Sequence, residues 1–146
     1  MKPQPFIVTP DSYPAPLKIV GEQITVLASG AATAGYEIFL QNGPEGSGPP
    51  PHFHPWDESF YVTAGEIKFG IEQDSFVAQP GTLVHLPAGT THWFLFGAGG
   101  GQMISMTSRL AASQMFTDLD REVSPENPDM VKLIEVAGRH GLAAGS

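Results

Sequence analysis

The sequence predicts an all-β domain, a sandwich or barrel of about nine strands, followed by a short helical tail. Apolar runs of about four to eight residues, rich in Val, Ile, Thr, Phe and Tyr, recur from residue 17 to residue 108. Glycine and proline, 17 and 14 of the 146 residues, separate these runs as turn residues do. Helical periodicity begins only after Ser108.

The first 16 residues predict an extended arm rather than a helix. They contain five prolines, at positions 3, 5, 10, 14 and 16. Proline fixes φ, lacks an N–H group and pushes the residue before it toward extended backbone. We therefore expect residues 1–16 to lie as an arm on the domain or on a partner.

Residues 17–108 are predicted to form the β-barrel itself. The predicted strands are residues 17–20, 22–29, 36–41, 58–64, 66–72, 74–79, 82–87, 91–96 and 102–108. A chain of this length favours one domain, and no linker leads to a second globular unit.

Residues 109–146 are predicted to be a helical tail that packs on the barrel. Its two helical stretches are residues 113–123 and 127–141. In the second stretch Asn127 is the expected N-cap, Pro128 fits the first helical position and Gly141 ends the helix. Apolar residues then fall on one face: Met130, Leu133, Ile134 and Ala137. Arg109 is expected at the surface, with contact to an anionic substrate as the alternative.

Composition and charge exclude several classes of function. The formal net charge is −8 and only seven residues are Lys or Arg, so no nucleic-acid partner is expected. No apolar stretch approaches the ~20 residues of a membrane span, and the first ten residues lack the apolar segment of a signal peptide. A soluble cytoplasmic protein without a membrane partner is the expectation. Because the chain has no cysteine, a metal would need His, Asp or Glu ligands.

Two histidines and a glutamate share the spacing of one strand face. Side chains two residues apart point to the same side of a strand, so His52 and His54 project together, and Glu58 continues this parity. His92, after a Pro-x-Gly turn, offers a fourth donor. These four side chains suit one divalent metal ion. A lone His-x-His is more often an ordinary pair near a turn, but the third and fourth donors favour the metal site.

The phenylalanines of the predicted strands have two interpretations. The simpler one makes them barrel core, and the functional one lets some of them line a pocket that accepts a small aromatic molecule. Both can hold, because a small barrel encloses only a small cavity. The residues concerned are Phe39, Phe60, Phe69, Phe94 and Phe96.

The residues of the predicted metal site resemble the two cupin motifs. The first, G-x5-H-x-H-x3-E-x6-G, is met without a gap from Gly46 to Gly65, and the second, G-x5-P-x-G-x2-H-x3-N, from Gly81 to His92, with Phe96 in place of its Asn. The stretch around the first motif and the helical tail look like single-domain bacterial cupins grouped with quercetin dioxygenases. The resemblance implies a jelly-roll or double-stranded β-helix barrel, a homodimer, and metal ligation by the four residues His52, His54, Glu58 and His92.

The resemblance also implies a dioxygenase-type enzyme that acts on a small hydroxylated aromatic or keto compound. Glu58 is then both a ligand and the candidate catalytic base. The metal is Fe, Mn, Ni, Cu or Zn, and the sequence does not choose among them. The alternatives are a metal-dependent isomerase or lyase, a cupin that binds a small ligand without turning it over, and a metal that only stabilises the barrel.

Overall fold

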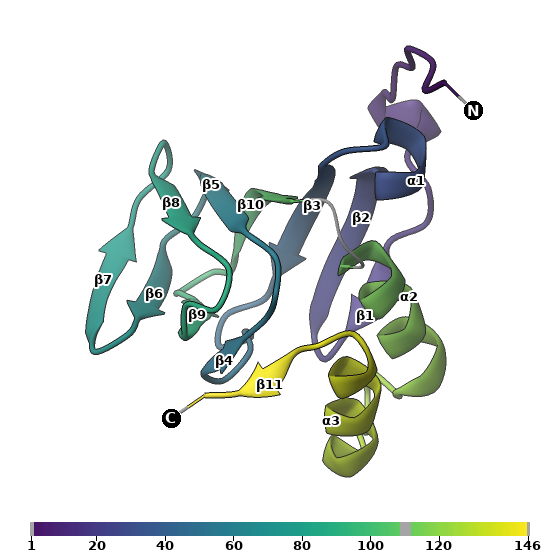
Figure 1. Cartoon of the computed structure of the whole chain (residues 1–146). Helices are drawn as coiled ribbons and strands as arrows, with labels where there is room; N and C mark the ends of the chain where they lie inside the picture. Colours follow the sequence, from purple (N-terminus) through teal and green to yellow (C-terminus); the bar gives the residue numbers. More distant parts are fainter. Residues whose placement is uncertain (1, 109–111, 146) are drawn as a thin grey trace.

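The computed structural model describes residues 2–108 and 112–145 (Figure 1). Arg109 lies outside the described residues, so its predicted surface position is not addressed. The elements in chain order are η1 (Pro10–Ser12), β1 (Leu17–Ile19), β2 (Glu22–Ala28), α1 (Gly30–Thr33), β3 (Glu37–Gly43), β4 (His52–Phe53), β5 (Glu58–Ala64), β6 (Ile67–Ile71), β7 (Asp74–Ala78), β8 (Leu83–Leu86), β9 (His92–Phe96), β10 (Gly101–Thr107), α2 (Ala112–Glu122), α3 (Met130–Arg139) and β11 (Ala143–Ala144).

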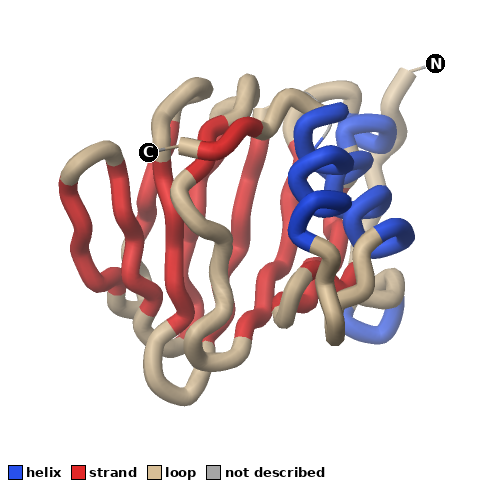
Figure 2. The backbone as a smooth tube through the Cα atoms, turned by 90° about the horizontal axis from the view of Figure 1, so that it is seen from below, coloured by secondary structure: helices blue, strands red, loops and turns tan. Residues whose placement is uncertain are grey.

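Two antiparallel sheets face each other, which confirms the predicted all-β fold. The larger sheet has the order β1-β2-β3-β10-β5-β8 and the smaller β11-β4-β9-β6-β7. From β5 to β10 the chain passes repeatedly from one sheet to the other, so the two sheets form one barrel, with the helices at one side (Figures 1 and 2). Each of the nine predicted runs contains a strand, and the two-residue strands β4 and β11 lie outside these runs.

Two hydrophobic clusters fill the space between these layers. The first lies between the sheets and contains the aromatic residues Phe60, Phe69, Phe94 and Phe96. The second lies between the β1–β3 end of the larger sheet and the helices: Ile24, Phe39, Trp56, Ala112, Met115, Leu119, Val123, Val136 and Ala137. The smaller sheet does not cover this end of the larger one, so the C-terminal helices complete the core there.

Side chains of the barrel hold the two C-terminal helices in place. Glu37 of β3 is buried and its carboxylate accepts hydrogen bonds from the backbone N–H groups of Gly30 and Ser113, the latter in the first turn of α2. A carboxylate at a helix N-terminus satisfies free N–H groups and complements the helix dipole. After α3 the chain returns to the barrel, where β11 pairs with β4.

The start of α3 differs from the prediction. Asp129, not Asn127, is the N-cap, and its carboxylate accepts hydrogen bonds from the N–H groups of Val131 and Lys132. Asp and Asn are equally good caps, and the cap lies two residues after the one predicted from Pro128. Gly141 follows the helix with a φ of +92°, as its predicted role at the helix end requires.

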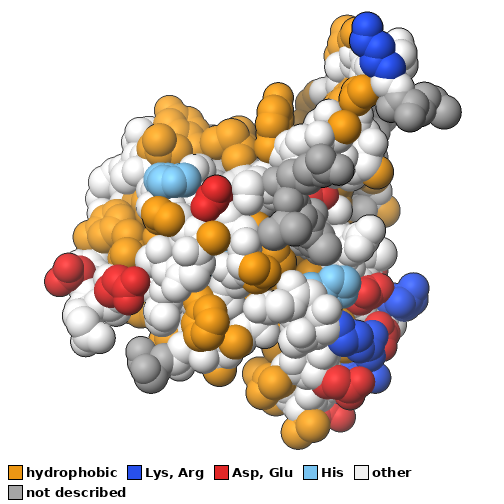
Figure 3. Space-filling view, in the orientation of Figure 1, with side chains coloured by type: hydrophobic (Ala, Val, Ile, Leu, Met, Phe, Trp, Pro, Cys, Tyr) orange, Lys and Arg blue, Asp and Glu red, His pale blue; other side chains and the backbone are white. Residues whose placement is uncertain are grey.

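The outer faces of α2 and α3 carry a network of ion pairs. Arg139 donates to both carboxylate oxygens of Glu122 at 2.9 and 3.0 Å, and Lys132 lies beside the same carboxylate. In the space-filling view, Lys and Arg side chains gather with Asp and Glu over these helices (Figure 3). Because such pairs are exposed, each contributes little to stability. No helix among the described residues is long and apolar enough to cross a membrane.

The N-terminal arm is exposed and extends from the barrel (Figure 1). Phe6 and Ile7 are 49% and 88% exposed, and Leu95 on β9 is 41% exposed. The helices leave Leu95 uncovered because they pack against the other end of the molecule. Exposed apolar side chains in an arm and on a sheet favour contact with another chain.

We propose that the chain forms a two-fold homodimer in which the arm contributes to the interface. A stable interface needs about 800 Å² from each partner. In light scattering at low micromolar concentration, we expect twice the 15.5 kDa mass of one chain. Deleting residues 2–16 should shift the population toward monomer. A monomeric intact chain would reject the dimer, and a dimer unaffected by the deletion would place the interface elsewhere.

Candidate metal centre

Strands β4 and β9 place the two histidine motifs side by side. His52 and His92 are direct partners in the antiparallel pairing of these strands, and their ring centroids are 4.3 Å apart. His54 follows on the same face as His52, and its carbonyl accepts a hydrogen bond from the Gly89 N–H group of the Pro-x-Gly turn. The pairing of two short strands therefore brings together residues that are 40 positions apart in the chain, His52 and His92.

Each of the three histidines is oriented by the backbone in the same way. The Nδ1 atoms of His52, His54 and His92 lie 2.8, 3.0 and 2.8 Å from the carbonyl oxygens of residues 50, 56 and 90. A carbonyl oxygen only accepts, so each Nδ1 carries the hydrogen. In a neutral ring the Nε2 lone pair is then free to bind a metal, and such outer contacts fix the orientation of histidine ligands.

The free ring nitrogens of the three histidines lie close together, and two of them lie beside the carboxylate of Glu58. Candidate ligand atoms of the three histidines all lie within 4.8 Å of one another. Glu58 Oε1 is 3.1 Å from His54 Nε2 and 3.5 Å from His92 Nε2. His92 Nε2 is buried and has no hydrogen-bond partner. Lone pairs that face one another in a buried site repel unless a proton or a cation lies between them.

Burial and neighbouring charge shape the ionisation of this cluster. Burial alone would raise the pKa of Glu58, but in the metal-free site the neighbouring His54 and His92 rings outweigh it and lower the pKa to about 2, because a proton on Nε2 would be shared with the ionised carboxylate. Burial lowers the pKa of His52 to about 4, with a further decrease from His92. At neutral pH the site therefore holds an ionised carboxylate and a neutral His52, which are the forms that bind metals.

These observations fit a divalent metal. The buried triad of His52, His54 and His92 has the donor type, convergence and outer hydrogen bonds of a metal site. Trp56, only 1% exposed, stacks on His54 with ring centroids 4.4 Å apart, so it shields one side of the site from water. Glu58 lies at the distance at which a shared metal ion would replace its direct contact with the two rings.

A largely apolar cavity of about 600 Å³ opens beside the histidines. It lies between the barrel and the C-terminal helices rather than wholly inside the barrel. Its polar side chains are Glu22, Gln41, His52, His54 and Glu58. Its apolar wall includes Met130, Leu133, Ile134 and Ala137, the residues predicted to share one face of α3. The apolar face of α3 therefore lines the cavity instead of covering an outer sheet.

The five phenylalanines fall into two groups. Phe60 and Phe94 line the cavity. Phe39, Phe69 and Phe96 do not: they are at most 1% exposed, in the two core clusters. Phe39 packs edge-on against Phe116 of α2, 5.1 Å between centroids, so the helix occupies the space that a ligand would need. The functional interpretation is thus limited to the two residues next to the histidines.

Two further polar residues near the motifs, His85 and Asp57, have structural contacts. His85 lies on the exposed face of β8, where its Nδ1 is 2.8 Å from Ser59 Oγ. Asp57 fixes the loop before β5, because its carboxylate accepts a hydrogen bond from the Ala88 N–H group and its own N–H donates to Ser108 Oγ. Neither side chain lines the cavity.

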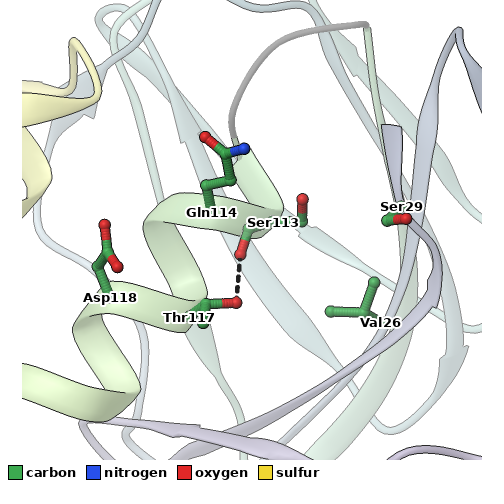
Figure 4. Close-up of a pocket in the computed structure, with 6 residues that line it drawn as sticks. All are labelled: Val26, Ser29, Ser113, Gln114, Thr117 and Asp118. Carbon is green, nitrogen blue, oxygen red and sulfur yellow. Dashed lines mark hydrogen bonds between the residues drawn. The ribbon is translucent and has the colours of Figure 1, made fainter. Parts of the chain in front are cut away.

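A second hollow lies between β2 and α2 (Figure 4). It has a volume of about 380 Å³ and is lined by Val26, Ser29, Ser113, Gln114, Thr117 and Asp118. The hydroxyl of Thr117 donates to the carbonyl of Ser113 within the helix, so it does not point a free donor into the hollow. None of the candidate metal ligands lines it.

Glu22 and Gln41 are the polar cavity residues that the sequence interpretation missed. Glu22 has the same parity as buried Ile24 on β2, and this is the signal that could have found it. Burial is the main cause that raises the pKa of Glu22 to about 8; the hydrogen bond from Gln41 lowers it, and the charge of Glu58 raises it further. Glu22 is therefore protonated at neutral pH in the folded chain.

This raised pKa predicts a loss of stability at alkaline pH. Between pH 4.5 and 8 the folded state holds a proton that the unfolded state releases, so stability falls as pH rises until Glu22 ionises in the fold near pH 8. From pH 6 to pH 9 the metal-free protein should lose about 2–3 kcal/mol through this group, from about 1.4 kcal/mol per pKa unit. Urea unfolding measures it. Glu22→Gln should flatten the profile, whereas the exposed control Glu66→Gln should not; equal slopes in all three proteins would refute the shift.

Comparison with known proteins agrees with this architecture. Residues 39–104 match the Cupin domain family. An RmlC-like cupin from Shewanella frigidimarina has a TM-score of 0.68 at 16% identity, over 78% of this chain and 99% of that one. KdgF from Halomonas sp. has a TM-score of 0.64 at 20% identity, over 70% of this chain and 94% of that one. The polyketide cyclase RemF from Streptomyces resistomycificus has a TM-score of 0.62 at 19% identity, over 72% of this chain and 79% of that one.

A search of curated proteins found no relative with significant sequence similarity. At the identities above, the structural likeness establishes the fold and not the activity. The matched residues 39–104 include both histidine motifs and the strands that carry them. Residues 39–104 of the barrel, which carry the buried three-histidine site, therefore match the Cupin domain family, and the barrel has the two-sheet fold of the cupins.

Proposed function

We propose that this chain is a metal-dependent enzyme that acts on a small hydroxylated aromatic or keto compound, with dioxygenase-type chemistry as the leading reaction. One observation supports it above the others: His52, His54 and Glu58 line an apolar cavity of about 600 Å³, and His92 completes the three-histidine cluster beside Glu58. A metal that only stabilised the barrel would not need an adjoining cavity.

The metal would be held by His52, His54, His92 and Glu58. Imidazole and carboxylate donors suit Fe, Mn, Ni, Cu and Zn, and no thiolate is present to favour a softer ion. When bound, such an ion polarises the oxygen atoms of a chelating substrate or activates a small molecule beside it. The backbone carbonyls that accept from the Nδ1 atoms would keep the three rings in place during turnover.

Glu58 is positioned to take a proton from the substrate. Its carboxylate lines the cavity and is ionised at neutral pH because the two histidines outweigh its burial. A substrate hydroxyl that enters the cavity beside this group can lose its proton to a carboxylate oxygen. Phe60, Phe94 and Trp56 surround that position and exclude bulk water from it.

The cavity wall favours neutral substrates. Among the described residues that line it, none is Lys or Arg. A phosphate or sulfonate group would therefore find no cationic partner except the metal itself. The apolar faces of α2 and α3 on the opposite side suit aromatic or aliphatic parts of a small molecule.

Reactions without oxygen remain a second candidate. Proteins of similar fold include, besides RemF, a DMSP lyase, a sugar phosphate isomerase and an oxalate oxidase. One fold thus accommodates several reactions, and proton removal by Glu58 would serve an isomerase or lyase as well as a dioxygenase.

The test is metal analysis of the protein from its native host, followed by O₂ uptake and product analysis with catechols, flavonols and diketones. Metal-dependent O₂ uptake with one compound class would support the dioxygenase. Anaerobic turnover would favour the isomerase or lyase. Tight binding of a compound without any turnover would show a ligand-binding protein, and protein isolated without metal that fails to bind one would reject the proposal.

A further inference from the structure

Two polar side chains face the cavity from β2 and β3, outside the cupin motifs. Glu22 and Gln41 lie on the inner face of the larger sheet and are 7% and 3% exposed. Apart from the candidate metal ligands and the indole N–H of Trp56, they are the only polar side chains among the described residues that line the cavity. They belong to the end of the sheet that faces the helices (Figure 1).

The hydrogen bonding of this pair is incomplete. Gln41 Nε2 donates to Glu22 Oε1 at 3.1 Å, but Gln41 Oε1 is buried and has no partner. A buried acceptor without a partner is costly, and a typical fold supplies one. On the same sheet the buried carboxylate of Glu37 shows the satisfied case, because both its oxygens accept hydrogen bonds from Gly30 and Ser113. The pair lacks such a structural task.

The chemistry of the pair selects a neutral group with a hydrogen to donate. Gln41 Oε1 needs a donor, and Glu22, protonated at neutral pH, can donate or accept. A carboxylate or phosphate on the ligand would offer only acceptors to Gln41 Oε1. A hydroxyl group both donates and accepts, so it satisfies the two residues together.

We propose that Glu22 and Gln41 form a subsite on the β2–β3 wall of the cavity that binds a hydroxyl group of the substrate. This inference rests on the proposed function for the claim that the cavity holds a substrate. It narrows the substrate to a neutral, largely apolar molecule with one group for the metal and a second, hydroxyl group for this pair. Glu22 and Gln41 are then specificity residues and take no part in bond breaking.

The test compares p-cresol with toluene, which differ by one hydroxyl group, on the full chain loaded with Zn²⁺. NMR titration of ¹⁵N-labelled protein follows both the fragment affinities and the side-chain amide signal of Gln41. We expect p-cresol to bind about five- to tenfold more tightly than toluene, as one hydrogen bond to a buried acceptor gives. The Gln41 amide signal should shift with p-cresol only.

Substitution separates this subsite from general burial. Gln41→Met keeps the size of the side chain and removes the acceptor, so toluene should bind at least as well as p-cresol. The matched control is Gln23→Met, on the exposed face of β2, which should keep the preference of the natural chain. Glu22→Gln keeps a donor and an acceptor, so it should retain most of the preference for p-cresol over toluene. This variant is the substitute test if Gln41→Met does not fold.

Three results would each overturn the subsite. The first is a p-cresol preference that survives Gln41→Met, and the second is binding of p-cresol without a shift of the Gln41 signal. The third is no binding of p-cresol at 10 mM, a concentration about a hundredfold above the dissociation constant of a moderate fragment. The zinc content of the same samples is measured in parallel. Retained zinc with no hydroxyl preference rejects only the subsite, whereas absent zinc rejects the proposed function.

Discussion

Replacing both His52 and His92 by alanine is expected to abolish metal binding while the barrel remains folded. The two rings lie 4.3 Å apart on paired strands, and each presents Nε2 to the same point. Loss of an outer partner of a histidine ligand typically costs 10–100-fold in metal affinity, so loss of two ligands should cost well over 100-fold. Elemental analysis after dialysis against a trace of metal measures the effect.

The control for this experiment is His85→Ala. His85 has the same side chain but lies on the exposed face of β8, where it contacts Ser59 rather than the cluster. Metal content should stay at the level of the natural chain in this variant. The β circular-dichroism signal should persist in both proteins, because the two rings make no backbone strand pairing and their removal leaves only the carbonyls of residues 50 and 90 without a side-chain donor. Full metal retention in the double variant would remove the metal centre.

The strands and the shared buried face of His52, His54 and Glu58 could be predicted because one physical rule governs both. Alternation of side chains across a strand gives each predicted run a buried and an exposed face. From His52 to Phe60 the even-numbered residues are buried and the intervening ones are exposed or half-buried, even across the Pro55–Trp56 bend. Asp57 holds this bend through the hydroxyl of Ser108 and the backbone N–H group of Ala88, so the alternation of side chains continues from His54 to Glu58.

The position of the cavity could not be predicted from alternation. The apolar stripe on α3 shows that one helix face is covered, but not by what. In the structure the position of the cavity depends on contacts between residues distant in sequence. Examples are the Glu37 carboxylate at the start of α2 and the pairing of β11 with β4. These contacts turn the stripe toward the histidines, and they place Phe116 against Phe39. Phe39 is therefore a core residue, although it lies on the same face of β3 as the cavity residue Gln41.

Glu22 escaped the sequence interpretation for a related reason. A single glutamate at the start of a strand, after Gly21, normally marks the solvated end of a turn. Here the helices extend over this end of the sheet, and the carboxyl group becomes buried beside Gln41. Burial by a distant segment overrides the local preference of the residue.

Replacing Glu58 by glutamine is expected to reduce turnover by about 10²–10⁴-fold, the usual contribution of a general base, while much of the metal remains bound. Glutamine keeps the size and one oxygen donor of the side chain, so it can still approach the two histidines, but its amide cannot accept the substrate proton. The three imidazoles, each held by a backbone carbonyl, would continue to bind the metal.

Two measurements together decide the role of Glu58 once a substrate has been found. Metal content per chain shows whether the residue is needed for binding, and turnover of the metal-loaded variant shows whether it is needed for the reaction. Glu58→Asp is the informative partner variant: it keeps the carboxylate but shortens the side chain, so it should recover part of the activity that glutamine loses. Unchanged turnover in metal-loaded Glu58→Gln would leave Glu58 a ligand only. In that case the proton would go to water or to another group, because Glu22, the remaining carboxyl group among the described cavity residues, already holds a proton at neutral pH.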